Sequence, residues 1–132
     1  VSLNHNFHTD AVYFDFAKAF DSVNHDLLLQ KLKFRYHIDG PLLNFIKNYL
    51  QYRQQQVVIG NSTSTPCKVN SGVPQGSIVG PLLFVLFIND ISENISPDTN
   101  IALYADDTKM YREIHSKQDN VILQHDIKTL QT

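Results

Sequence analysis

The chain has 132 residues, of which 42% are hydrophobic, enough for one compact domain with a buried core. Its formal net charge of −2 lacks the positive excess of self-sufficient nucleic-acid-binding modules, although the carboxylates of a metal site would also lower the charge. A single cysteine, Cys67, excludes an internal disulfide and a cysteine-rich zinc site and favours an intracellular setting, nucleus or cytoplasm, and the apolar run Ile78–Ile88 is too short to cross a membrane.

The first predicted element is a β-strand over Ala11–Phe14, whose residues are β-prone and lead directly into Asp15. We expect this strand to be buried and to end in a functional turn. Apolar residues at helical spacing then predict a helix over Asp26–Tyr36 that stops at Gly40. A second helix is expected to open at Pro41, because proline is tolerated in the first turn.

The middle of the chain predicts a hairpin, a loop and a third helix. The hairpin spans Gln55–Val69 and turns at Gly60–Ser62, and the loop Ser71–Gly76 contains two glycines and a proline. The helix over Leu82–Ile91 follows, with Pro81 in its first turn. Because this helix lacks a polar face, we expect it to be the most buried one.

A second hairpin is predicted near the C-terminus, with strands Ile101–Tyr104 and Thr108–Tyr111 and with Ala105, Asp106 and Asp107 at its tip. A polar helix from about Lys117 ends the chain. Strands and helices in this order predict an α+β fold with an antiparallel sheet of the split βαβ (RRM or ferredoxin-like) type and helices packed on one face.

Three acids stand at the ends of two predicted strands, Asp15 on one and the pair Asp106 and Asp107 on the other. If these strands are neighbours, like charges meet, and cations are needed to neutralise them. Two Mg²⁺ ions, or Mn²⁺, would suit oxygen ligands and in-line phosphoryl transfer. We expect Asp15 and Asp106 to be direct ligands and Asp107 to have a weaker metal or primer-positioning role. The alternative is that all three are solvated turn acids.

Three segments together resemble the reverse transcriptases, most closely those of non-long-terminal-repeat (LINE-type) retrotransposons. They are Ala11–His25, Ser71–Leu82 and Ala102–Asp107, the last containing Tyr-Ala-Asp-Asp. Their order along the chain is that of the family. The resemblance implies a polymerase palm that acts as an RNA-directed DNA polymerase, with an RNA template, a DNA primer and deoxynucleoside triphosphates as partners.

The resemblance also implies roles for individual residues. Asp15 and Asp106 would be metal ligands, and the backbone of Phe16, Ala17, Lys18, Ala19 and Phe20 would contact the incoming triphosphate. The Phe20 ring would clash with a ribose 2′-hydroxyl and so favour deoxynucleotides. Gln75 and Gly76 would line the nucleotide pocket, where glycine lets the backbone approach the substrate.

Other polar and aromatic residues receive structural interpretations. We expect Asp21 and Asn24 to be caps or turn formers, His25 to cap a helix and Cys67 to pack as a small hydrophobic residue. The group Tyr49, Tyr52 and Arg53 could stack on or grip nucleic acid, but helix packing is the favoured interpretation.

The family pattern places a fingers region before Val1 and a thumb after Thr132, so we expect residues 1–132 to be a single palm fragment with little or no polymerase activity by itself. The oligomeric state is left open. A nucleotidyl cyclase is an alternative that the loop Pro74–Gly76 and Phe20 argue against. A second alternative is an inactive retrotransposon-derived remnant or an RNA-binding scaffold, which the three intact acids argue against.

Overall fold

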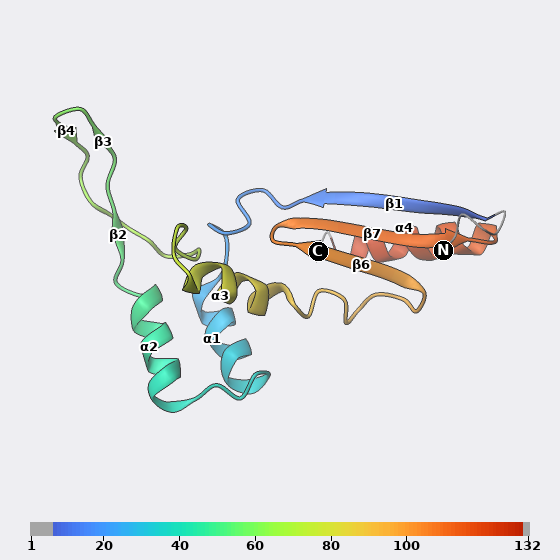
Figure 1. The fold of residues 1–132 in the computed structure, drawn as a ribbon, viewed down its shortest axis with the longest axis horizontal. Coiled ribbons are helices and arrows are strands. Elements are labelled where there is room, and N and C mark those ends of the chain that lie inside the picture. The colour runs from blue at the N-terminus through green and yellow to red at the C-terminus, as the bar shows by residue number, and fades with distance from the viewer. Residues whose placement is uncertain (1–6, 131–132) are drawn as a thin grey trace. The chain divides into compact units, whose positions relative to one another are not determined.

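A computed structural model describes residues 7–130 of the chain (Figure 1). The chain is divided into two compact units. The described residues of the first unit are 7–17 and 88–130, and the second unit contains residues 18–87. Four helices and antiparallel sheets occur in this part of the chain, which confirms a mixed α and β fold. No helix within residues 7–130 is both long enough and apolar enough to cross a membrane.

The first unit is built on a three-stranded antiparallel sheet of order β1-β7-β6. Its strands are β1 (His8–Asp15), β6 (Thr99–Tyr104) and β7 (Asp107–Ile114). The predicted strand and hairpin are therefore confirmed, with longer strands than expected. The expectation that β1 is buried is wrong, because within residues 7–130 β1 has a neighbouring strand on one side only and its residues are exposed or half-buried.

The helix α4 (Lys117–Leu130) packs against β7 and covers one face of this sheet (Figure 1). Thr108, Met110 and Arg112 are every second residue of β7 and are buried, whereas Asp107 and Lys109 alternate with them and belong to the opposite face. The sheet thus has one face under α4 and one open face. The helix expected from about Lys117 is confirmed as far as Leu130, and its continuation to Thr132 lies outside the described residues.

Buried charges in the first unit are satisfied by hydrogen bonds. Asp126 is fully buried and accepts bonds from Ser96, through both its N–H and its hydroxyl, and from the Thr99 hydroxyl at 2.7 Å. Arg112 donates to the Pro97 carbonyl at 2.6 Å and forms an ion pair with Asp119 at 3.0 Å. Because an unpaired buried charge is costly, this network joins α4 to the strands and to the segment before β6.

The second unit contains α1 (His25–Phe34), α2 (Gly40–Leu50) and α3 (Val79–Ile88). Asn24 caps α1 by accepting a bond from the Leu27 N–H at 3.0 Å, which confirms its expected role, and Asp39 caps α2. The expectation that α3 is the most buried helix is confirmed, because seven of its ten residues are buried or half-buried, a larger share than in α1, α2 or α4, although Leu82 and Val85 are 58% and 48% exposed. The fully buried side chains of this unit are Val23, Leu28, Leu32, Leu50, Leu83 and Phe84.

The predicted hairpin after α2 is present but divided into two short ladders, and it extends away from α2 (Figure 1). One ladder pairs β2 (Gln54–Gln55) with β5 (Cys67–Lys68), and the other pairs β3 (Val58–Ile59) with β4 (Ser62–Thr63). Cys67 is exposed, so the expectation that it packs as a small hydrophobic residue is wrong. A two-stranded ribbon lacks a second layer that could bury its side chains.

The loop Ser71–Gly76 is held against the segment that follows β1 by backbone contacts. The N–H groups of Gly72 and Val73 donate to the carbonyls of Val23 and Phe20, both at 2.8 Å. Gly72 has a φ of +88°, and a Cβ atom there would lie 2.8 Å from the Asp21 Cα. This close approach therefore requires glycine at position 72.

Replacing Gly72 should destabilise the second unit more than replacing another glycine with positive φ. Gly72→Ala adds both an unfavourable left-handed conformation, about 1–2 kcal/mol, and a backbone overlap. Gly60→Ala is the matched control, because Gly60 has a φ of +58° and nothing within 4 Å of the added atom. Urea denaturation of both variants should show the larger loss of unfolding free energy for Gly72→Ala, and equal losses would contradict the steric account.

Acid should destabilise the first unit through Asp119. Hydrogen bonds from the Ser116 hydroxyl and from Arg112 lower the pKa of this carboxyl from 3.8 to about 2. Since the folded state has the lower pKa, the stabilisation is present above about pH 4 and is lost as the pH falls through about 2. Asp119→Asn should lower stability at neutral pH and remove this part of the pH dependence, measured by urea denaturation from pH 7 to pH 2.5. Asp98→Asn, at an exposed acid of the same unit, controls for the loss of one charge.

Candidate active site

Two carboxylates face each other across the edge of the first unit's sheet. Strand β1 ends at Asp15, β7 begins at Asp107, and the antiparallel register makes these two residues Cα partners. Directly opposed residues project from the same face of a sheet, with Cβ atoms about 4.5–5.5 Å apart. Both residues are exposed, so this edge presents a concentrated negative charge to solvent.

Asp106 lies in the turn beside this pair. Tyr104 pairs with Asp107, so the hairpin is closed by a two-residue loop of Ala105 and Asp106. Ala105 has a φ of +54°, a conformation that is unfavourable for a residue other than glycine. The tip that the sequence predicted is therefore tight, and Asp106 is half-buried within it.

The sequence placed Asp15 beside Asp106, whereas the backbone register puts Asp107 directly opposite Asp15. Which acid lies opposite Asp15 depends on the strand that pairs with β1 and on the register of that pairing. Strand pairing between segments so far apart in the chain has no signal in local residue patterns. The length of the hairpin loop is one local signal that favours Asp107 as the partner of Asp15. A two-residue loop makes Asp107 the first residue of the returning strand.

The donor chemistry of this edge fits a hard divalent cation. Carboxylate oxygens are the ligands that Mg²⁺ and Mn²⁺ prefer, and opposed like charges favour a bound cation. Within residues 7–130, no group of three or more aspartate, glutamate, histidine or cysteine side chains is arranged to hold a metal ion. A site formed by all three aspartates stays a prediction.

A groove of about 420 Å³ lies along the same edge and includes Asp15 and Asp107. Two residue pairs further from the edge, the Lys109 ammonium lies 5.4 Å from the centre of the Tyr13 ring and 5.5 Å from that of Tyr111. Two aromatic faces thus hold a positive charge in the groove that also contains the two carboxylates. The groove is lined by Tyr13, Phe14, Asp15, Ala102, Leu103, Tyr104, Asp107, Thr108 and Lys109.

The segment after β1, which was expected to contact a triphosphate, is shared between the two units. Phe16 and Ala17 belong to the first unit, where the Phe16 ring stacks against Phe14 with centroids 6.4 Å apart. Lys18 begins the second unit in a turn, with a φ of +52° and an exposed side chain. The Lys18 carbonyl accepts the N–H groups of Asp21 and Ser22, both at 2.9 Å.

Phe20 and the loop containing Gln75 and Gly76 come together in the second unit. The Phe20 ring stacks on Phe84 of α3 at a centroid distance of 4.2 Å, so its position is fixed by the core. The Gln75 amide donates to the Asp21 carboxylate at 3.4 Å, and Gly76 is exposed. Ala19, in the same turn, is buried.

His25 and Asp21 connect the two segments in ways that the sequence did not reveal. His25 is buried as the first residue of α1, and its Nε2 donates to the Gly72 carbonyl at 2.7 Å. The Asp21 carbonyl accepts the Ser71 hydroxyl at 2.8 Å. Asp21 is thus a turn former, as expected, and also an anchor for the loop Ser71–Gly76.

Removing one charge from the opposed pair should stabilise the first unit in metal-free buffer. Like charges directly opposite in a sheet are unfavourable by roughly 0.2–1 kcal/mol, so Asp15→Asn should raise the free energy of unfolding by about that amount. Thermal melting at low salt measures the gain, which should shrink at high salt because salt screens exposed charges. A loss of stability, or a gain independent of salt, would show that the two carboxylates do not repel each other.

Comparison with known proteins places the chain in a family. A model of the family described as "Reverse transcriptase (RNA-dependent DNA polymerase)" matches residues 4–132. The chain is 42% identical over 82 residues to the "Probable RNA-directed DNA polymerase from transposon BS" of Drosophila melanogaster. The aligned residues cover 62% of this chain and 9% of that protein. In the same organism it is 35% identical over 95 residues to the "Probable RNA-directed DNA polymerase from transposon X-element" (72% of this chain, 10% of that protein). It is also 36% identical over 103 residues to the "RNA-directed DNA polymerase from mobile element jockey" (73% and 11%).

The chain spans 9–11% of the length of these three relatives. The three segments that suggested the resemblance all lie within the matched range of residues 4–132. The chain belongs to the reverse transcriptase family, and to the non-long-terminal-repeat type that its sequence predicted.

Proposed function

We propose that this chain is the catalytic palm of an RNA-directed DNA polymerase. In this reaction the 3′-hydroxyl of a DNA primer, paired with an RNA template, attacks the α-phosphate of a deoxynucleoside triphosphate. A bond to the primer oxygen forms, the bond to the bridging oxygen breaks, and pyrophosphate leaves. The observation that carries the proposal is the opposition of Asp15 and Asp107 at one sheet edge, with Asp106 in the adjoining turn.

Asp15, Asp106 and Asp107 would hold two Mg²⁺ ions, with Mn²⁺ as a substitute. When bound, two such ions would activate the attacking hydroxyl and stabilise the charge on the departing pyrophosphate. The contribution of the chain is to hold the carboxylates in advance of binding. Hydrogen bonding between β1 and β7 and the two-residue turn both restrict where these acids can move.

The nucleotide would contact the backbone of Phe16–Phe20 and the loop at Gln75 and Gly76. Phe20 would exclude a ribose 2′-hydroxyl, and its stack on Phe84 supports this role because a ring fixed by the core cannot move aside freely. The bond from Gln75 to Asp21 supports the loop's role, since it joins the two segments that would contact the substrate.

We further propose that residues 1–132 are a single palm fragment of the split βαβ type that acts with fingers and thumb regions inside an intracellular polypeptide. The antiparallel order β1-β7-β6 with α4 on one face supports this architecture. The small share of each relative that the chain covers supports a longer parent protein. The 132-residue chain alone should then show little or no primer extension.

Alanine at Asp15 or at Asp106 should abolish polymerase activity. The protein to test is a longer polypeptide, of the relatives' length, that contains this chain. Asp15→Ala and Asp106→Ala should each lower kcat by at least roughly 10²–10³-fold, because positioned electrostatic stabilisation is lost. Primer extension on an RNA template measures the rate, and Asp98→Asn is the control for an exposed acid outside the site, because asparagine tolerates the φ of +67° at this position. Retained turnover in either variant, with an intact fold by circular dichroism, would overturn the proposal.

The metal part of the proposal has a readout that does not need activity. Mg²⁺ should raise the melting temperature of the 132-residue chain, and Asp15→Asn should remove most of that rise, because ligand binding to the folded state stabilises it. RNA binding without any effect of Mg²⁺ on melting would instead favour an RNA-binding scaffold. Cyclic nucleotide formed from ribonucleoside triphosphates would favour a cyclase.

A further inference from the structure

The two segments of the second unit that would contact the nucleotide are joined by main-chain hydrogen bonds. One segment contains Phe20, and the other is the loop Ser71–Gly76. An isolated antiparallel bridge between Asn24 and Ser71 marks the point where the two segments meet. Because Phe20 and Gln75 belong to opposite segments, the separation of the segments would set the width of the space that a sugar could occupy.

His25 reaches from α1 to the carbonyl of Gly72 in this loop. The residue is buried, and its Nε2 lies 2.7 Å from the carbonyl oxygen. A carbonyl can only accept, so Nε2 carries the hydrogen and donates it. A hydrogen bond that is shielded from water is electrostatically stronger than one at the surface. His25 is therefore a fixed contact between α1 and a residue 47 positions further along the chain.

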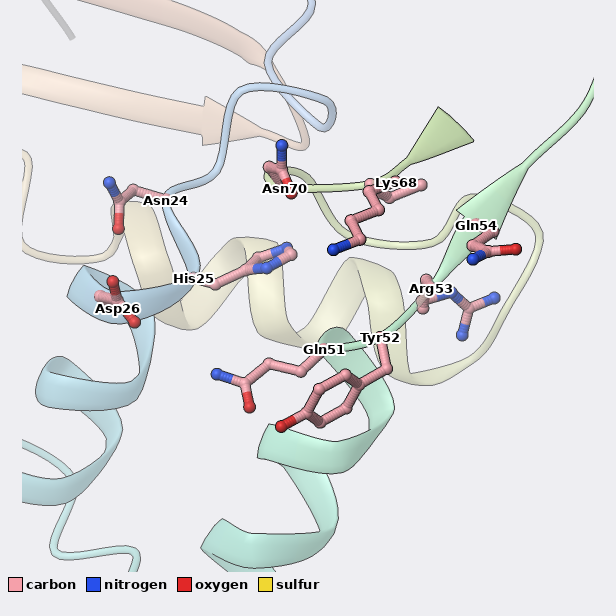
Figure 2. Close-up of a pocket in the computed structure, with 10 residues that line it drawn as sticks. Asn24, His25, Asp26, Gln51, Tyr52, Arg53, Gln54, Lys68 and Asn70 are labelled. Carbon is pink, nitrogen blue, oxygen red and sulfur yellow. The ribbon is translucent and has the colours of Figure 1, made fainter. Parts of the chain in front are cut away.

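Figure 2 shows the His25 ring extending from the start of α1 into a pocket of about 510 Å³. The pocket is lined by residues 24–26 at the start of α1, residues 51–54 after α2 and residues 68–70 before the loop. Tyr52 also lines it and is 92% exposed, so the expectation that Tyr52 packs against helices is wrong. A shorter side chain at position 25 would leave the Gly72 carbonyl without this donor and beside open space.

The backbone of His25 is held firmly by the helix that it begins. His25 is the first residue of α1, and the side chain of Asn24 caps this helix. Leu28 and Leu32 of the same helix are fully buried. Because closely packed side chains hold α1 in place, the imidazole ring transmits the position of this helix to the loop.

One peptide unit, that between Gly72 and Val73, links His25 to Phe20. A trans peptide is planar, so its C=O and N–H groups point in opposite directions. The Gly72 carbonyl accepts the His25 ring, and the Val73 N–H donates to the Phe20 carbonyl at 2.8 Å. Rotation of this peptide would weaken both bonds at once. Glycine restrains its own backbone little, so the bond from His25 contributes most where the chain is freest.

We propose that His25 is a positioning residue for the selection of deoxynucleotides over ribonucleotides, an inference that rests on the proposed polymerase function. Through the Gly72–Val73 peptide, His25 holds the loop with Gln75 at a fixed distance from the main chain of Phe20. The Phe20 ring is itself held by its stack on Phe84, so the loop is the side of the space that can move. With the loop fixed, a ribose 2′-hydroxyl clashes with the ring. With the loop released, the sugar can shift away from the ring and the hydroxyl fits.

The test compares two substitutions of His25 in a polypeptide of the relatives' length that contains this chain. A glutamine amide reaches about as far as Nε2, whereas an asparagine amide ends near the position of Nδ1. Primer extension gives kcat/KM for a deoxynucleoside triphosphate and for the matching ribonucleoside triphosphate. His25→Asn should lower the ratio of the two values about 5- to 10-fold, as expected for the loss of one buried hydrogen bond. His25→Gln should keep the ratio of the unchanged polypeptide.

His37→Asn is the matched control. His37 is an exposed histidine of the same unit, and asparagine tolerates its φ of +54°. This variant should have the ratio of the unchanged polypeptide. The KM for the template and primer should stay the same in all three variants, because His25 acts on the loop that would contact the nucleotide.

Amide hydrogen exchange in the whole 132-residue chain gives a readout that does not need activity. In His25→Asn the Val73 amide should exchange at least about tenfold faster, while the amides of α4 keep their rates, because only the loop opens more often. The proposal is overturned if Val73 exchange is unchanged, if both kcat/KM values fall by the same factor, or if His25→Gln loses as much discrimination as His25→Asn. Inactivity of the unchanged polypeptide would instead overturn the proposed function, and the exchange rates would still show whether His25 holds the loop.

Discussion

The pairing of β1 with β7 is the constraint on which the candidate site depends. Strand β1 begins the described chain and β7 comes near its end, so every residue between them must fold in a way that lets the two strands meet. Antiparallel hydrogen bonding then fixes the register over eight residue pairs, from His8 with Ile114 to Asp15 with Asp107. A shift of β1 by one residue would move Asp15 to the other face of the sheet and separate it from Asp107. The charge at this edge is therefore a property of strand pairing and not of any one turn.

In the second unit, too, segments that are distant in the chain are held together, here by hydrogen bonds in a loop and not by strand pairing. Gly72 permits an approach that no other residue allows, and its N–H bonds to Val23 while its carbonyl accepts the His25 ring. These contacts hold the loop with Gln75 against the segment with Phe20. One buried side chain, that of His25, thus helps to anchor the loop that would contact a nucleotide.

Local patterns predicted most of the elements, because each depends on short-range physics. Both hairpins and all four helices were predicted within a few residues. The signals were the spacing of apolar residues, the Asn24 cap and the turn residues of the two hairpins. Burial was predicted less well. Leu82 and Val85 of the apolar helix α3 are exposed, and so is Cys67, so hydrophobicity alone does not say which residues another layer will cover. The Tyr52 ring, expected to pack against helices, is exposed to solvent, and its backbone has a φ of +60°.

The sequence by itself determined the reverse transcriptase family, the order of the elements and the identities of the three acids. These follow from residue types at fixed local spacing, which a linear pattern records fully. Only the tertiary structure decided that Asp107 is the residue opposite Asp15, that Phe20 rests on Phe84, and that residues 24–26, 51–54 and 68–70 enclose one pocket. Each of these joins segments that are distant in the chain, and the free energy that selects among possible long-range pairings comes from packing and hydrogen bonds that no local window contains.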